Sequence, residues 1–126
     1  MKKRKKLNEA EWEVMEGVWH FSKPVTVRQV HSLLYPNGEK AYTTVQTFMN
    51  ILVEKGFLKR EKIGMVNFYA PNLSREDAAQ METKNLVSRI FHGSFGALAN
   101  YLINSGELSE QDLQKIKNLI EKKERK

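Results

Sequence analysis

The chain has 126 residues, of which 40% are hydrophobic, 10% aromatic and 29% charged, proportions typical of a folded globular protein. It contains no cysteine, which excludes disulfides, thiolate nucleophiles and cysteine-ligated metal sites. The net charge is +6, and no apolar run approaches the roughly 20 residues that a membrane-spanning helix needs, so we expect a cytosolic chain, without membrane insertion, that attracts polyanions.

The first predicted helix begins after Asn8 and runs to about Phe21. Asn8 is a favourable N-cap, and Glu11, three residues later, is placed to complete a capping box. Glu11 falls on the otherwise apolar side of this helix, and the capping role accounts for its position there. The segment Ser22-Lys23-Pro24 is predicted to break the helix.

A second helix is predicted from Val27 to about Leu34, with Thr26 as its N-cap. Val25, just before it, can add one short extended stretch. The segment Pro36-Asn37-Gly38 that follows is a strong turn signal. The side chains predicted to face inward are Val27, Val30, Leu33 and Leu34.

A third helix is predicted from Tyr42 to Lys55, and it ends at Gly56, a residue type favoured just after a helix. Its inward side comprises Val45, Phe48, Met49 and Leu52. An outward stripe recurs at helical spacing and carries mostly short, uncharged donor–acceptor side chains where an exposed helix usually carries Lys and Glu. We call this set the polar stripe: Thr43, Gln46, Thr47, Asn50 and Glu54.

Two short strands are predicted at residues 57–62 and 66–70, joined by Ile63-Gly64-Met65. The order of three helices followed by a basic hairpin is that of a winged helix-turn-helix. The predicted fold class is therefore mainly α, with a winged helix-turn-helix head at residues 7–72. A basic flexible tail is predicted at residues 1–6.

Residues 73–126 are predicted to form a helical dimerisation segment. Three amphipathic helices are expected there, at about Arg75–Phe91, around residues 95–102, and after Ser109 to about Lys123. About 50 residues cannot bury enough apolar surface alone, so either the head or a second copy must cover them, and a symmetric dimer is the commoner solution. The residues predicted to form the dimer interface are Phe91, Phe95, Leu98, Tyr101, Leu102, Leu113, Ile116 and Ile120.

The polar stripe has the side-chain chemistry needed to read base edges in a major groove. Amides suit adenine, hydroxyls suit several bases, and a threonine methyl can contact a thymine methyl. The predicted base-contacting residues are Thr43, Thr44, Gln46, Thr47 and Asn50. Contacts to the DNA backbone are predicted from the start of the second helix and from the wing, at Thr26, Arg28, Lys59, Arg60 and Lys62.

Catalytic patterns are absent from the sequence. His20, His31 and His92 lack metal-ligand spacing, and no nucleophile elbow, P-loop or dinucleotide glycine pattern occurs. We therefore predict no enzyme activity, no metal and no cofactor. Two readings remain: a sequence-specific dimeric repressor, or a winged-helix module that binds protein without specific DNA binding.

Two segments of the head resemble a known family of repressors. Residues 7–15, LNEAEWEVM, and residues 44–57, TVQTFMNILVEKGF, resemble the penicillinase and methicillin-resistance repressors, the BlaI/MecI family. The segments Phe91-His92-Gly93-Ser94-Phe95 and Glu107-Leu108-Ser109 are similar to that family's dimerisation region. The resemblance implies a dimeric winged-helix repressor that binds double-stranded DNA at an inverted-repeat, palindromic operator, in the setting of antibiotic resistance.

The resemblance also implies a mode of release. In the best-known members a membrane metalloprotease senses a β-lactam, and the repressor is cut within its C-terminal helices at an Asn–Phe bond. The matching residues here are Asn100, Tyr101 and Leu102: a gap-free match places Tyr101-Leu102 at the bond, and Asn100-Tyr101 keeps an Asn–aromatic pair. Those members carry basic residues where Thr43 and Gln46 stand, which implies a different operator preference.

Overall fold

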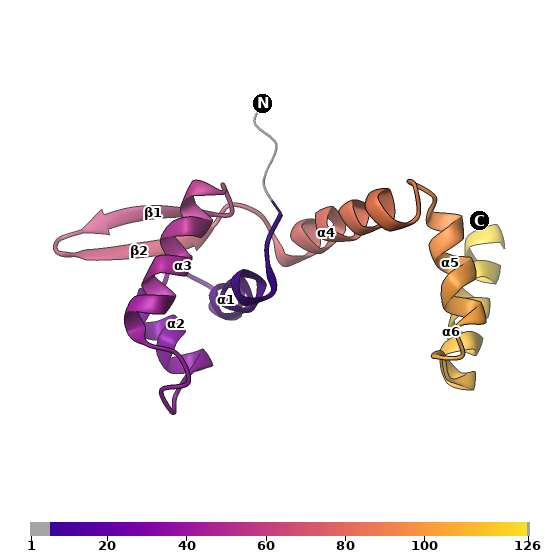
Figure 1. Cartoon of the computed structure of the whole chain (residues 1–126), viewed down its shortest axis with the longest axis horizontal. Helices are drawn as coiled ribbons and strands as arrows, with labels where there is room; N and C mark the ends of the chain where they lie inside the picture. Colours follow the sequence, from indigo (N-terminus) through magenta and orange to yellow (C-terminus); the bar gives the residue numbers. More distant parts are fainter. Residues whose placement is uncertain (1–5, 126) are drawn as a thin grey trace. The chain divides into compact units, whose positions relative to one another are not determined.

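A computed structural model describes residues 6–125, so the predicted basic tail at residues 1–6 lies outside the described residues except for Lys6. The predicted order of elements is confirmed (Figure 1). No helix within residues 6–125 is long and apolar enough to cross a membrane. The elements are α1 (Glu9–His20), α2 (Val27–Leu34), α3 (Tyr42–Glu54), β1 (Leu58–Ile63), β2 (Val66–Pro71), α4 (Arg75–Ile90), α5 (Phe95–Asn104) and α6 (Glu110–Arg125).

The chain forms two compact units that divide within α4. The first, which we call the head, ends at Gln80, and the second, the C-terminal unit, begins at Met81. This division falls later in the chain than the boundary at residues 72–73 that the sequence predicts. The first turn of α4 stays with the head because Arg75 forms a bidentate ion pair with Glu16 of α1. The Nε–Oε1 distance is 2.7 Å and the Nη2–Oε2 distance is 2.9 Å.

The predicted capping box at the start of α1 is confirmed. The Asn8 side chain accepts a hydrogen bond from the Glu11 N–H at 2.8 Å, and Glu11 Oε1 accepts one from the Asn8 N–H at 3.0 Å. Glu11 is only 3% exposed, and Lys55 Nζ donates to its Oε1 at 2.6 Å. The Glu11 carboxylate thus completes the cap at the start of α1 and, through Lys55, links α1 to the end of α3.

Helices α1, α2 and α3 pack around the core of the head. Gly17 of α1 makes a close approach possible, because a Cβ placed there would lie 2.9 Å from the side chain of Leu34 on α2. Full burial of an aliphatic or aromatic side chain contributes roughly 1.5–3 kcal/mol. The buried apolar residues of the head are Leu7, Val14, Met15, Val18, Val25, Val27, Val30, Tyr35, Val45, Met49, Leu52, Phe57, Leu58, Tyr69 and Ala78.

Two residues predicted to face inward differ in the structure. Leu33 is 39% exposed, so its predicted burial is wrong. Val27, Val30 and Leu34 already form the inward stripe of the short α2, and Leu33 lies about 100° around the helix from Leu34. Phe48 is only half-buried, and Lys40 Nζ lies 5.6 Å from its ring centroid on the outer side.

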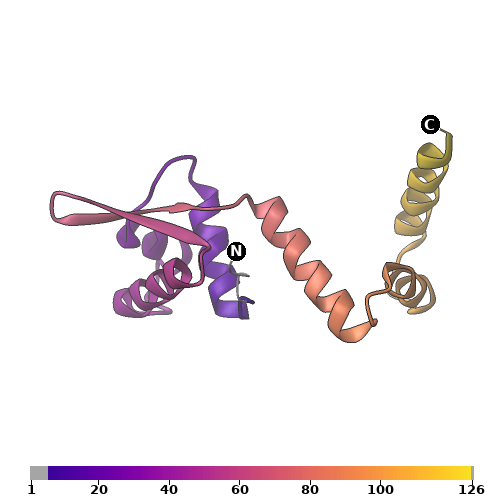
Figure 2. The same ribbon diagram turned by 90° about the horizontal axis from the view of Figure 1, so that it is seen from above.

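Strands β1 and β2 pair as an antiparallel hairpin from Leu58↔Pro71 to Ile63↔Val66. The turn is shorter than predicted, because Ile63 belongs to β1. Gly64 takes a positive φ of 64° at the first turn position, as a two-residue hairpin turn favours. The predicted extended stretch at Val25 is confirmed, since its backbone pairs with Tyr69 at 2.7 and 2.9 Å. The free end of the hairpin projects beyond α1, α2 and α3 (Figures 1 and 2).

The C-terminal unit comprises the rest of α4 with α5 and α6. Ser94 caps α5 through the Ala97 N–H at 2.9 Å. Ser109 and Asp112 form a capping box at the start of α6, with hydrogen bonds of 3.0 and 3.3 Å. Helix α6 runs to Arg125, slightly beyond its predicted end. Neither α5 nor α6 has a buried side chain. Most of their large apolar side chains are therefore exposed in a single chain.

Candidate nucleic-acid interface

The polar stripe lies on the side of α3 away from the core. Thr43, Gln46 and Thr47 are exposed, whereas Thr44 and Asn50 are half-buried. The Thr47 hydroxyl donates to the carbonyl of Thr43 at 3.0 Å, which leaves its oxygen lone pairs and its methyl group available. The exposed part of the stripe thus offers one amide and two threonines within the first half of α3.

Asn50 has partners inside the head. Its Oδ1 accepts hydrogen bonds from Arg60 Nη1 at 2.6 Å and from the hydroxyl of Tyr69 at 2.9 Å. An asparagine that reads adenine uses its oxygen and its nitrogen together. Because the oxygen is engaged, Asn50 acts here as a link between α3 and both strands of the hairpin. Base reading by Asn50 stays a prediction.

Glu13 of α1 contacts two residues of the turn between α2 and α3, Tyr35 and Lys40, and so holds this turn in place. The hydroxyl of Tyr35 donates to Glu13 Oε1, and Lys40 Nζ lies 3.7 Å from the same oxygen. Burial, together with the hydrogen bond to Glu13, raises the pKa of Tyr35 well above its ordinary value. His31 Nε2 lies 2.7 Å from the carbonyl of Lys40, so this nitrogen carries the proton and donates. These contacts fix where α3 begins.

The start of α2 carries the two residues predicted to contact the DNA backbone there. The Thr26 hydroxyl accepts from the Gln29 N–H at 3.2 Å, and Gln29 Oε1 accepts from the Thr26 N–H at 2.9 Å, a capping box that confirms the predicted cap. Arg28 is exposed, and its guanidinium lies 5.6 Å from the ring centroid of Tyr42. Tyr42, 39% exposed at the first position of α3, was not singled out from the sequence.

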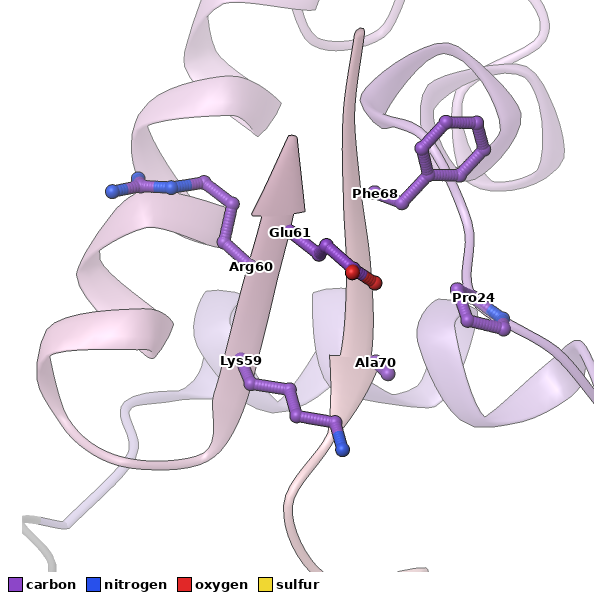
Figure 3. Close-up of a pocket in the computed structure, with 6 residues that line it drawn as sticks. All are labelled: Pro24, Lys59, Arg60, Glu61, Phe68 and Ala70. Carbon is purple, nitrogen blue, oxygen red and sulfur yellow. The ribbon is translucent and has the colours of Figure 1, made fainter. Parts of the chain in front are cut away.

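The predicted wing cations divide between the two faces of the hairpin. Arg60 pairs with Tyr69 in the register and points toward α3, and Lys62 shares that face by alternation. Lys59 and Glu61 project from the opposite face (Figure 3). A hollow of about 430 Å³ lies along that outer face, lined by Pro24, Lys59, Arg60, Glu61, Phe68 and Ala70.

A smaller cleft lies between the start of α3 and the free end of the hairpin. Its volume is about 180 Å³, and it brings Thr26 of the α2 cap together with Gln46 of the polar stripe. Met65, at the second turn position of the hairpin, lines the same cleft. The complete lining is Thr26, Val27, Tyr42, Gln46, Met65, Val66, Asn67 and Tyr69.

Two lysines of the head, Lys55 and Lys40, are engaged in contacts within the head. Lys55 Nζ is held by Glu11 at 2.6 Å and by the carbonyl of Lys6 at 3.1 Å. Lys40 Nζ lies over the rings of Tyr35 and Phe48, at 5.2 and 5.6 Å from their centroids. The exposed cations between residues 22 and 71 are Lys23, Arg28, Lys59, Arg60 and Lys62.

The C-terminal unit exposes most of the residues predicted for dimerisation. Phe95, Tyr101, Leu102, Leu113 and Ile120 are 39–59% exposed, and Phe91, Leu98 and Ile116 are half-buried. A hollow of about 460 Å³ on this unit is lined by Leu86, Ile90, Phe91, Leu98 and Tyr101. The sequence prediction missed Leu86 and Ile90, although their i, i+4 spacing on α4 is the signal that would have found them.

The residues matched to a cleavage site lie within α5. Asn100, Tyr101 and Leu102 are exposed and helical, and the Asn100 carbonyl accepts a hydrogen bond from the Asn104 side chain at 3.0 Å. Among residues 6–125, no group of three or more histidine, aspartate or glutamate side chains is placed to hold a metal ion.

Comparison with known proteins shows a match to a family of repressors. The family model described as penicillinase repressor matches residues 7–122. The penicillinase repressor of Bacillus licheniformis is 27% identical over 121 residues, 96% of this chain and 94% of that protein. The methicillin resistance regulatory protein MecI of Staphylococcus aureus strain N315 is 24% identical over 117 residues, 93% of this chain and 94% of that protein.

Two solved structures resemble the head. One is the DNA-binding domain of the repressor BlaI in solution, with a TM-score of 0.53, and the other is the monomeric form of Bacillus licheniformis BlaI in complex with the blaP half-operator, with a TM-score of 0.50. Each is 34% identical and covers 61% of this chain and 93% of the other.

Proposed function

The chain belongs to the penicillinase repressor family and is a DNA-binding transcriptional repressor, and we propose that it acts as a homodimer on an inverted-repeat operator. The two relatives compared above are named as regulators of gene expression. A repressor acts on the chromosome, so the proposed location of this chain is the bacterial cytoplasm. The observation that carries the proposal is the exposed, uncharged half of the polar stripe, with free cations on both sides of it.

In the proposed docking, the first half of α3 enters the major groove. Thr43, Gln46 and Thr47 face the base edges, and Thr44, half-buried, contacts the rim of the groove. Asn50 holds the wing in place through Arg60, so its contribution to base reading is indirect in this arrangement. Arg28, Lys59 and Lys62 lie at the periphery and contact phosphates, which fixes the register of α3 without reading sequence.

The second copy in the proposed dimer covers the apolar side chains of the C-terminal unit. Phe95, Tyr101 and Ile120 are 51–59% exposed in one chain, and isologous pairing of the same surface would remove them from water. Apolar burial contributes about 25 cal/mol per Å². A dimer also presents two copies of α3, which matches an operator with two half-sites.

Release by proteolysis in α5 forms the last part of the proposal, with a membrane metalloprotease as the partner that makes the cut. The matched residues, Asn100, Tyr101 and Leu102, are exposed but helical, so α5 must open locally before a protease can hold the segment in extended form. A cut there separates the rest of α5 and α6 from the head. The two copies of α3 are then no longer tethered, and operator affinity falls.

The decisive experiment selects sequences from a random duplex pool with the full chain. We expect an inverted repeat to emerge, bound more tightly than random duplex at physiological salt, with affinity that falls steeply as salt rises. The same duplex should carry two chains by sedimentation. If the selected pool showed no sequence preference over random DNA, or if one chain alone occupied the full repeat, the proposed mode of binding would be wrong.

A further inference from the structure

Tyr42 is a large aromatic side chain at the surface of the head. It is the first residue of α3 and is 39% exposed, so it adds little to the core. Its ring contacts two side chains of α2. The guanidinium of Arg28 lies over the ring at 5.6 Å from its centroid, and the ring of His31 approaches edge-on, with 6.1 Å between the two centroids. Tyr42 therefore joins the start of α3 to the outward side of α2.

His31 is itself held in place. Its Nε2 donates to the carbonyl of Lys40 at 2.7 Å, and Lys40 directly precedes Ala41, the N-cap of α3. The ring of His31 also lies 6.3 Å from that of Tyr35, which is only 5% exposed. Aromatic rings at these separations attract one another when they are tilted or edge-to-face. The ring of Tyr42 is thus restricted by a side chain that is anchored both to the turn and to the core.

Arg28 is exposed and has no acidic partner in the head. Within residues 6–125 it takes part in no ion pair. Ordering a free arginine side chain on an anion costs conformational entropy. A contact within about 6 Å of a ring centroid reduces that freedom, and it leaves the charge of the guanidinium without a carboxylate partner. Arg28 is therefore a partly ordered donor for an external anion such as a phosphate.

The same ring borders the residues that face the bases in the proposed docking. Tyr42 and Gln46 are one turn apart on α3 and line the cleft of about 180 Å³ together with Thr26, the cap of α2. When Gln46 faces the major groove, the start of α2 lies beside the sugar–phosphate strand at the edge of that groove. Arg28, two residues after Thr26, then lies next to the phosphates of this strand.

We propose that Tyr42 is a positioning residue for operator binding. Its ring holds the guanidinium of Arg28 where a phosphate passes, and this contact fixes the depth and register at which Gln46 and Thr43 lie in the groove. Tyr42 carries no charge and reads no base in this role. The inference rests on the proposed function, and it adds a residue of α3 that determines how well a phosphate contact from α2 is formed.

Two other roles of Tyr42 lead to different results. In one, its hydroxyl donates directly to a phosphate, which phenylalanine at this position would abolish. In the other, its ring only stabilises the packing of α2 against α3, and replacement lowers the melting temperature. Neither role passes through the charge of Arg28. The salt dependence of affinity, which counts the phosphates neutralised by cations, therefore separates them from the positioning role.

The test compares Tyr42→Leu, Tyr42→Phe, Arg28→Gln and the double variant Tyr42→Leu/Arg28→Gln in the full chain. Leucine keeps apolar bulk without a π face, and phenylalanine keeps the π face without the hydroxyl. Arg89→Gln, at an exposed cation of α4, is the control for the change in net charge. The probe is a duplex selected by the wild-type chain from a random pool. Affinity is measured over a range of salt, with the melting temperature of each variant.

We expect Tyr42→Leu to weaken binding roughly threefold for each chain, and so about tenfold for a dimer. Its salt slope should fall toward that of Arg28→Gln, which should be lower than wild type by about one for each chain bound. An uncharged residue whose loss lowers the salt slope must act through a cation. Tyr42→Phe should restore most of the affinity and slope, and the double variant should bind no more weakly than Arg28→Gln. Arg89→Gln should keep the wild-type slope.

Three results would overturn the positioning role while leaving the proposed function in place. One is wild-type affinity and salt slope for Tyr42→Leu or for Arg28→Gln. The second is weaker binding by Tyr42→Leu with an unchanged slope, which would assign Tyr42 to packing alone. The third is an equal loss in Tyr42→Phe and Tyr42→Leu, which would make the hydroxyl a direct contact to DNA. A wild-type chain that selects no sequence would overturn both proposals together.

Discussion

Asn50 Oδ1 accepts a hydrogen bond from the hydroxyl of Tyr69 at 2.9 Å, which joins the polar stripe of α3 to the buried face of β2. The same oxygen accepts from Arg60 on β1 at 2.6 Å. The stripe therefore serves two purposes along its length. Its first half, around Gln46, is open for contact with a partner, whereas Asn50 sets the position of the hairpin relative to the helix.

Replacing Asn50 should cost stability, and replacing Gln46 should not. Asn50→Ala leaves the hydroxyl of Tyr69, a residue that is 1% exposed, without its acceptor, and such a loss costs about 1–3 kcal/mol. Gln46→Ala, on an exposed position of the same stripe, should change the free energy of unfolding by less than about 0.5 kcal/mol. Urea denaturation of the two variants measures the difference.

Gln46→Ala and Asn50→Ala should also differ in how they bind duplex DNA. Gln46→Ala should relax the base preference at a single position of a selected duplex, while Asn50→Ala should weaken all sequences alike through a displaced wing. A variant Asn50→Ala with native stability and relaxed preference at one base pair would show that Asn50 reads a base directly.

The sequence predicted the elements of the head because local signals there agree with one another. The caps at Asn8 and Thr26, the turn at Pro36-Asn37-Gly38 and the glycine of the hairpin turn each fix a boundary through short-range chemistry. The periodicity of α3 also separates its buried side from its polar stripe. These signals need only neighbouring residues, and a single sequence contains them.

Side-chain contacts between residues far apart in the chain could not be predicted from the sequence. Nothing local indicates that Asn50 contacts Tyr69, that Lys55 is held by Glu11, or that Leu33 is left outside a stripe completed by Leu34. Each depends on the angle between two elements, which periodicity does not provide. The division of the wing cations between two faces was within reach, because strand alternation places Lys59 and Arg60 on opposite sides.

Glu11 should be the most sensitive glutamate of α1. Its carboxylate completes the capping box with Asn8 and pairs with Lys55 at 2.6 Å while being 3% exposed. Glu11→Ala removes the box and leaves a partly buried ammonium unpaired, so we expect a loss of about 2–4 kcal/mol in the free energy of unfolding. Glu9→Ala, exposed in the same turn, is the matched control and should cost less than about 0.5 kcal/mol.

A comparison with Glu11→Gln tests the ionic part of this loss. The amide oxygen can still accept from the Asn8 N–H, but it carries no charge for Lys55. The variant should lie between wild type and Glu11→Ala in chemical denaturation. Equal stability of Glu11→Gln and wild type would mean that the charge contributes nothing and that capping alone explains the burial.

The ion pair between Glu16 and Arg75 should make the stability of the head depend on pH. The hydrogen bond from Arg75, with one from Trp12 at 3.1 Å, holds the pKa of Glu16 below its ordinary value of 4.5. A carboxyl whose pKa is lower in the folded state stabilises the fold above 4.5, and that contribution disappears as pH falls through the folded pKa. Both side chains are more than a third exposed, so the effect is small.

Glu16→Gln should therefore lose some stability at neutral pH and match wild type in acid below the folded pKa. Urea midpoints across this range measure it, and Glu76→Gln, an exposed glutamate in the first turn of α4, is the control with no such crossover. A difference between Glu16→Gln and wild type that stays constant from neutral pH into acid would exclude the ion pair as its cause.

The apolar surface of the C-terminal unit should control both oligomeric state and operator affinity. Phe95 and Tyr101 are 51% and 59% exposed, so replacing both with serine removes contacts a second copy would use but few within the chain. We expect this double variant to sediment as a monomer, whereas Lys117→Ser, an exposed residue of α6, should remain dimeric. Because tethering two heads multiplies their binding, the monomer should bind a duplex with two half-sites about 10²–10⁴-fold more weakly. Its affinity for a single half-site should be unchanged, and a double variant that keeps the wild-type mass and affinity would place the dimer interface elsewhere.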